Sequence, residues 1–367
     1  MADDRLKKLA RNILGYSVDL KQGERLMIRG PLSAKPVIME LVKQANAIGA
    51  MPFVRILDEE LSRCMLEGAT DGRLELENKW DMDIYQDIDA DVSFISEEND
   101  SEFSSIDPAI MQRRAHARRP WVDLVTRKKK WVLLNWPTKG QAQNARMPYE
   151  EFYDFVIDAS SMDYSQMKKN MQPLAELMSQ TDNVRITGPG TELTFSIKGI
   201  PNVICAGENN LPDGELFTAP VKHSVEGVLS YNTPSLYHGR VYRNVRLEFK
   251  KGKIVKASAE SGSDALNAIF DTDEGARYIG EFSFGLNPHI TKPFGNTLFD
   301  EKICGSFHFT PGCAYETAAD NGNRSAIHWD MVCIQTKEYG GGEIWFDGVL
   351  IRKDGMFVLP ELKALNP

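Results

Sequence analysis

Two histidine-containing stretches in the second half of the sequence carry side chains that can bind a metal ion. On a strand, successive side chains point to opposite faces, so Phe307 and Phe309 would enter a core while His308 faces the other way. The same alternation places His328 and Asp330 on one face, about 7 Å apart along a regular strand. That separation suits ligands of adjacent metal ions, or of one ion on a bulged strand.

Two glutamates have a similar placement. Glu281 opens a strand-like run of alternating aromatic and polar residues, and Glu215 closely follows a turn. Imidazole suits zinc-like metals and carboxylate suits harder ones, so these groups together would suit Zn²⁺, Co²⁺ or Mn²⁺. Two metal ions about 3.5–4 Å apart are a common hydrolytic arrangement.

Each of these residues also has an ordinary structural interpretation. A His-x-Asp pair on a strand is more often a solvated face or a local hydrogen bond, and a glutamate at a strand start is usually a surface charge. No His-Glu-x-x-His motif is present. For Cys304 and Cys313, which lie near the same stretches, a buried structural thiol is favoured over a nucleophile. Spacing alone therefore gives only a hypothesis of a metal site.

The first 160 or so residues alternate helix-like and strand-like patterns. Short apolar runs that read as strands, with helical segments between them, occupy residues 25–28, 52–56, 91–95 and 131–134. Strands separated in this way indicate βαβ units and a mostly parallel sheet. The pattern predicts an α/β domain over residues 1–180.

After about residue 182 the strand-like runs become closely spaced and are separated by hairpin turns. A single helix is expected near residues 263–270. This half is predicted to form a mixed α+β, strand-rich domain over residues 181–367, and it carries the candidate metal site.

Composition narrows the class of protein. The 367 residues are 42% hydrophobic and 26% charged, with a net charge of −9, which indicates a soluble globular protein that does not bind nucleic acid in general. No apolar run approaches the roughly 18 residues of a membrane span. The mixed charges at the N-terminus do not resemble a signal peptide. Five scattered cysteines suggest reduced thiols, and we expect a cytoplasmic protein.

At the candidate site the sequence resembles the metalloaminopeptidase family that contains aminopeptidase T and aminopeptidase S. The segments that carry the resemblance in the second half are 210–220, 280–281, 285–288, 295–303, 305–308 and 325–330. Residues 6–26 and 106–108 with the following arginine-rich segment also look like family features. The resemblance thus covers essentially the whole chain.

The resemblance implies a metal-dependent aminopeptidase that releases N-terminal residues from peptides by means of a metal-activated water. The family's metal-binding positions correspond to Glu215, Glu281, His308, His328 and Asp330. Its catalytic tyrosine corresponds to Tyr315. It also implies a dinuclear site for Zn²⁺, Co²⁺ or Mn²⁺, a homodimer and peptide substrates.

Within that set, Glu281 is the candidate bridging ligand because a carboxylate has two oxygens, and Glu215 would ligate or serve as general base. Two alternatives stay open. The first is a metallohydrolase that acts on another small amide or ester. The second is a non-catalytic protein whose α/β domain holds a small anionic ligand.

Overall fold

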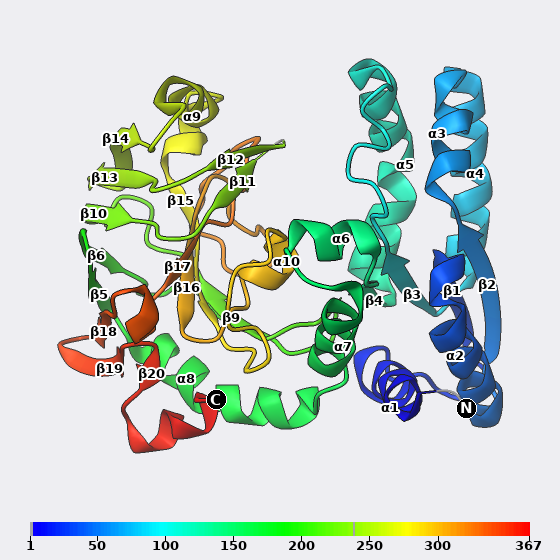
Figure 1. The fold of residues 1–367 in the computed structure, drawn as a ribbon, viewed down its shortest axis with the longest axis horizontal. Helices are drawn as coiled ribbons and strands as arrows, with labels where there is room; N and C mark the ends of the chain where they lie inside the picture. The colour runs from blue at the N-terminus through cyan, green and yellow to red at the C-terminus, as the bar shows by residue number, and fades with distance from the viewer. Residues whose placement is uncertain (1–2, 238) are drawn as a thin grey trace. The chain divides into compact units, whose positions relative to one another are not determined.

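The computed structural model describes residues 3–237 and 239–367, which divide into two compact units (Figure 1). The first unit contains the residues up to Asp163 together with Gly207–Pro212, and the second contains Tyr164–Ala206 and Asp213–Pro367. The predicted domain division at residue 180 stays a prediction, because these units reflect contacts in the folded chain and not independent folding.

The first unit is built on a five-stranded parallel sheet with the strand order β2-β1-β3-β4-β8. Its strands are β1 (Arg25–Pro31), β2 (Met51–Leu57), β3 (Ala90–Ile95), β4 (Lys130–Asn135) and β8 (Asn210–Leu211). The short strand β8 comes from the later part of the chain and extends the sheet beside β4. The predicted parallel sheet is confirmed, whereas β8 was not expected, because two residues are too few to show a strand pattern.

Helices cover both faces of this sheet. They are α1 (Asp4–Asn12), α2 (Lys35–Ile48), α3 (Glu59–Glu67), α4 (Asp71–Asp87), α5 (Pro108–Lys128), α6 (Lys139–Asn144) and α7 (Tyr149–Ser160). Met27 of β1 packs with Tyr85 of α4 and Trp121 of α5. Leu26 and Ile28 point to the opposite face and are also fully buried, and α2 contacts β1.

None of the helices within the described residues is long and apolar enough to cross a membrane.

The second unit is dominated by antiparallel strands. An eight-stranded sheet has the order β14-β13-β10-β6-β5-β18-β19-β20, and a five-stranded sheet has the order β17-β16-β15-β9-β7. The strands of the larger sheet are β5 (Asn183–Gly188), β6 (Thr191–Ser196), β10 (Glu226–Ser230), β13 (Arg246–Lys250), β14 (Lys253–Ser258), β18 (Glu343–Phe346), β19 (Val349–Lys353) and β20 (Met356–Phe357).

The smaller sheet consists of β7 (Val203–Cys205), β9 (Glu215–Thr218), β15 (Ile279–Gly285), β16 (Ser306–Pro311) and β17 (Val332–Ile334). A two-stranded sheet of β11 (Ser235–Tyr237) and β12 (Arg240–Tyr242) also belongs to this unit. Its α-helices, within the described residues, are α8 (Tyr164–Gln180), α9 (Ser263–Phe270) and α10 (Thr297–Asp300), and short 3-10 turns such as Glu274–Arg277 accompany them. The helix expected near residues 263–270 is confirmed as α9. The expected fold class, an α/β unit followed by a strand-rich unit, is confirmed.

An aromatic core joins the two large sheets of the second unit. Phe195 of β6 lies with its ring centroid 5.0 Å from that of Phe282 on β15 and 5.0 Å from that of Phe309 on β16. Phe249 of β13 meets Phe309 edge to face. Because β16 alternates, Phe307 and Phe309 enter this core while His308 points away from it, as the sequence predicted.

We predict that replacing Phe195 by alanine destabilises the second unit by about 3–5 kcal/mol, because the substitution opens a cavity between the two sheets. Calorimetric unfolding would measure the change. Val255→Ala, at a 56% exposed position of β14, is the control and should stay within about 0.5 kcal/mol of the parent protein. Equal stabilities for the two variants would contradict this account of the core.

Candidate metal centre

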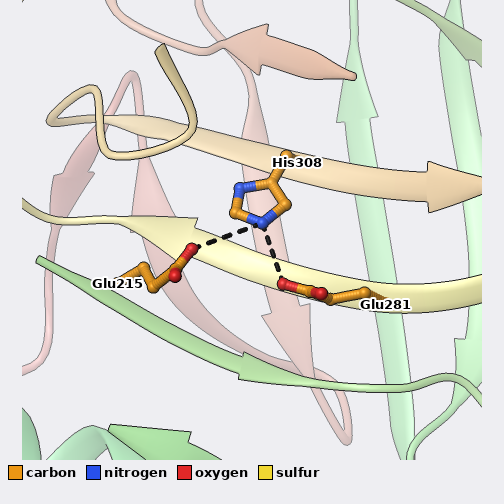
Figure 2. A group of neighbouring side chains, drawn as sticks. All are labelled: Glu215, Glu281 and His308. Atoms are coloured by element: carbon orange, nitrogen blue, oxygen red, sulfur yellow. Dashed lines mark hydrogen bonds and ion pairs between the residues drawn. The ribbon is translucent and has the colours of Figure 1, made fainter. Parts of the chain in front are cut away.

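Three neighbouring strands of the five-stranded antiparallel sheet in the second unit, β9, β15 and β16, bring Glu215, Glu281 and His308 together (Figure 2). The Nε2 atom of His308 lies 3.0 Å from Oε1 of Glu281 and 3.5 Å from Oε2 of Glu215. All three side chains are buried. Ligand atoms from the three residues lie within 4.8 Å of one another, which is close enough to surround one metal ion.

A bulge in β15 aims Glu281 into this cluster. The pairing with β16 shifts register between Ile279 and Glu281, so that Gly280 lies in the bulge. A Cβ atom at Gly280 would lie 2.3 Å from the carbonyl oxygen of Cys313, so only glycine permits the close approach of these two segments. Bulges commonly re-aim a side chain beside a functional site.

A second group of possible ligands combines Glu281 with His328 and Asp330. The Nε2 atom of His328 lies 3.2 Å from Oδ1 of Asp330 and 3.5 Å from Oε2 of Glu281. Thr310 donates a hydrogen bond of 2.8 Å to Oδ1 of Asp330 and so fixes that carboxylate. The two groups therefore share one residue, Glu281.

The prediction of a regular strand at His328 and Asp330 is wrong. His328 makes only an isolated bridge to Gly312, at the end of β16, and β17 starts two residues after Asp330. Gly312 has a φ of +114°, and a Cβ there would lie 2.1 Å from the carbonyl oxygen of Ile327. This segment is not a regular strand, and the side chains of His328 and Asp330 meet, with 3.2 Å between Nε2 and Oδ1.

Each imidazole is oriented by a backbone carbonyl. The Nδ1 atom of His308 lies 3.1 Å from the carbonyl oxygen of Glu301, and Nδ1 of His328 lies 2.8 Å from that of Cys313. Because a carbonyl oxygen only accepts, Nδ1 must be the donor in both rings. Each Nε2 then faces the carboxylates, in the arrangement typical of metal-binding histidines.

Charge is concentrated in the cluster. Burial raises the pKa values of Glu215 and Glu281. Burial opposes the charged form of His308, but the hydrogen bond and charge of Glu281 outweigh it and raise the pKa of His308 to about 9. For His328, the charge of Asp330 likewise outweighs burial and raises the pKa to about 10. In the metal-free cluster protons on the imidazoles thus offset the carboxylates, and metal binding would release them.

The residues present fit a divalent metal ion. Oε2 of Glu281 and Nε2 of His328 are buried, and neither makes a hydrogen bond in the described structure. They meet each other at 3.5 Å, and His328 also meets Asp330, at ion-pair distances without hydrogen-bond geometry, so a cation among these atoms would satisfy them better. The mixture of carboxylate and imidazole donors suits ions of the Zn²⁺, Co²⁺ and Mn²⁺ class.

Tyr315 lies beside this cluster. Its ring centroid is 5.0 Å from that of His328 and 5.3 Å from that of Phe217. The side chain is 47% exposed, so it can reach a substrate. Partial burial raises the pKa of Tyr315, and the neighbouring carboxylates Glu281 and Asp330 raise it further. The phenol therefore stays protonated and can donate a hydrogen bond.

All six residues named from the sequence thus gather in one region of the second unit. Sequence reasoning missed Glu301 and Lys302, which lie in the turn between α10 and β16 and contact the same cluster. Glu301 is largely but not fully buried, with 13% of its side chain exposed. It interacts electrostatically with Lys302, Asp330 and His308. A charged pair next to a short helix normally faces solvent, so no pattern in the sequence marked it.

A thiol nucleophile gains no support from the structure. All five cysteines are free. Burial raises the pKa of Cys304 to about 11, whereas reactive cysteines have lowered values. The structural interpretation of Cys304 is therefore favoured.

The sequence profile of the thermophilic metalloprotease family M29 matches residues 2–357, which is nearly the whole chain. The chain belongs to the M29 family. This membership confirms the expected metalloaminopeptidase family and its enzyme class, and it implies a divalent metal.

Relatives with established names agree with this assignment. Over 94% of this chain and 95% of the relative, the sequence is 26% identical to aminopeptidase T of Thermus thermophilus. It is 25% identical to aminopeptidase AmpS of Bacillus subtilis, with 87% of each chain covered. The solved structure of wild-type AmpT from Thermus thermophilus superposes with a TM-score of 0.81, covering 97% of this chain and 99% of that one at 24% identity. The last match shows that the two proteins share a fold.

The sharing of Glu281 leads to a prediction. If each donor group holds an ion, Glu281→Gln should weaken binding at both, because it removes one negative charge from both donor groups. Asp330→Asn should chiefly weaken one of them. Elemental analysis after dialysis against defined Zn²⁺ would measure the ions retained. Full retention by Glu281→Gln would contradict a shared ligand.

Proposed function

We propose that this protein is a metal-dependent aminopeptidase with a dinuclear centre. The observation that carries the proposal is the pair of donor groups that meet at Glu281, one with His308 and Glu215 and the other with His328 and Asp330. Membership of the M29 family and similarity to proteins named aminopeptidases support the same reaction.

In this proposal five side chains hold two ions of Zn²⁺, Co²⁺ or Mn²⁺. Glu281 directs Oε1 toward His308 and Oε2 toward His328, and is therefore the proposed bridge. Glu215 directs Oε2 toward His308 and is proposed as a ligand of the first ion. Its alternative role as general base stays a prediction.

When bound, divalent ions of this kind lower the pKa of water toward neutrality and polarise a carbonyl group. The protein's own groups supply the rest. The carbonyls of Glu301 and Cys313 fix the two imidazoles, and Thr310 fixes Asp330. Pre-set ligands need no rearrangement during the reaction, which is how a rigid site lowers a barrier.

Tyr315 is proposed to stabilise the negative oxygen that develops on the scissile carbonyl. Its ring is held between Phe217 and His328, yet nearly half of the side chain stays exposed. A neutral phenol held in this way can donate a hydrogen bond to that oxygen while it keeps its proton.

A metal centre also provides a reason for selecting a peptide's N-terminus. A bound ion would accept the lone pair of a free α-amine, which an acylated nitrogen cannot offer, because its lone pair is delocalised into the amide. We therefore propose short peptides with an unblocked N-terminus as substrates. A homodimer is proposed from the family resemblance.

Metal removal tests the proposal directly. Dialysis against EDTA should abolish release of nitroaniline from aminoacyl-nitroanilides, and Zn²⁺, Co²⁺ or Mn²⁺ should restore it. The matched N-acetyl substrate and an ester of the same amino acid separate an aminopeptidase from a general amidase or esterase. Equal rates on free and acetylated substrates would favour the broader hydrolase. Full activity in protein shown to be free of metal would contradict the proposal.

Replacing Tyr315 by phenylalanine tests the oxyanion role. Loss of one such donor typically lowers kcat about 10²–10³-fold, while metal content should stay normal because the phenol is not a proposed ligand. Tyr339→Phe, in the turn Lys337–Tyr339 before β18, is the control and should keep normal turnover. Unchanged kcat in Tyr315→Phe would remove this residue from the mechanism.

A further inference from the structure

Lys302 is a buried cation next to the proposed metal centre. Its side chain is fully buried, at 0% exposure. Three carboxylates surround its ammonium group: Glu215 with Oε1 at 3.4 Å, Asp213 with Oδ1 at 3.9 Å, and Glu301 in direct contact. A lysine is rarely this buried unless it is paired. Isolating such a charge is costly, so this position needs a reason.

The backbone around Lys302 is held firmly. Its amide donates to the carbonyl of Phe299 at 3.0 Å, and its own carbonyl accepts from the amide of Asn287 at 3.0 Å. Asn287 in turn donates its side-chain amide to the carbonyl of Asp213 at 2.6 Å. These bonds tie the backbone of Lys302, through Asn287, to Asp213, which lies two residues before Glu215 at the start of β9.

The two oxygens of Glu215 have different neighbours. Oε1 lies 3.4 Å from Nζ of Lys302, whereas Oε2 lies 3.5 Å from Nε2 of His308. An oxygen engaged by an ammonium group is a poor donor to a second cation, because the two positive charges repel. Oε2 is the oxygen that faces Nε2 of His308, and that same nitrogen also meets Oε1 of Glu281.

We propose that Lys302 is a positioning residue that makes Glu215 a one-oxygen ligand, engaging Oε1 and leaving Oε2 for the metal ion. This inference rests on the proposed metal centre. It adds a function for a residue outside the ligand set, because Lys302 fixes how a ligand binds. Its positive charge also offsets part of the charge of Glu215 and Glu301.

Titration with Co²⁺ alone, followed by visible absorption, tests the proposal. Removing the partner of a ligating group typically costs about 10–100-fold in metal affinity, so Lys302→Met should bind Co²⁺ that much more weakly and with an altered spectrum. If Lys302 acted only through its charge, removing it would tighten binding. Unchanged or tighter binding by Lys302→Met would therefore overturn the proposal.

Two controls separate this role from general destabilisation. Arg352 is also fully buried in the second unit, but it donates to the carbonyl of Ser306 and to the side-chain oxygen of Gln335. Within the described part of the chain it forms no ion pair with a proposed ligand. Arg352→Met should lower thermal stability and leave Co²⁺ affinity unchanged. Asp213→Asn keeps an acceptor for the amide of Gly214 and should also bind normally.

If Lys302→Met fails to fold, the double variant Lys302→Met/Asp213→Asn keeps the buried net charge and should show the same weakened binding.

A crystal structure of the Co²⁺-loaded parent protein decides the matter without any variant. Coordination by Oε2 of Glu215 alone, with Oε1 on Lys302, is expected. Coordination through Oε1 or through both oxygens would overturn the inference. Absence of saturable Co²⁺ binding by the parent protein would instead overturn the proposed function.

Discussion

The structure around the candidate site depends on one buried carboxylate that faces two imidazoles. Glu281 presents Oε1 to His308 and Oε2 to His328, and burying such a group is unfavourable unless positive charge surrounds it. The backbone carbonyls of Glu301 and Cys313 hold the rings so that their Nε2 atoms point inward. Protons or metal ions can supply that positive charge, and the two compete for the same Nε2 atoms. The fixed rings, the bulge at Gly280 and the turn at Gly312 all serve to keep this one carboxylate in place.

Much of the architecture could be predicted from the sequence, because it follows from periodicity. The parallel sheet of the first unit and the hairpins of the second repeat patterns that are regular over several residues. Helix α9 and the alternating faces of β16 were predictable for the same reason. Strand β8 was not, because its two residues carry no period and its partner β4 lies far away in the sequence. Pairing at that distance depends on tertiary packing.

The candidate site was predicted in composition and only partly in geometry. Residue type and family resemblance identified Glu215, Glu281 and the two histidines. The regular strand expected at His328 and Asp330 was wrong, because this segment forms only an isolated bridge to Gly312 before β17 begins. Lys302 was missed altogether. A lysine next to a glutamate gives the same sequence pattern in solvent or in a core, and only the fold determines which of these environments it occupies.

Strand β16 contributes to the core and to the candidate site at once. Phe307 and Phe309 pack among the phenylalanines between the sheets, while His308 and Thr310 alternate with them on the other side. The position of the His308 imidazole therefore depends on how firmly Phe307 and Phe309, its neighbours on the strand, are packed. If the packing of those phenylalanine rings loosened on warming, the ligand positions would become disordered before the strands unfold. We therefore expect the packing of these fully buried phenylalanine side chains to limit the temperature up to which the candidate site keeps its geometry.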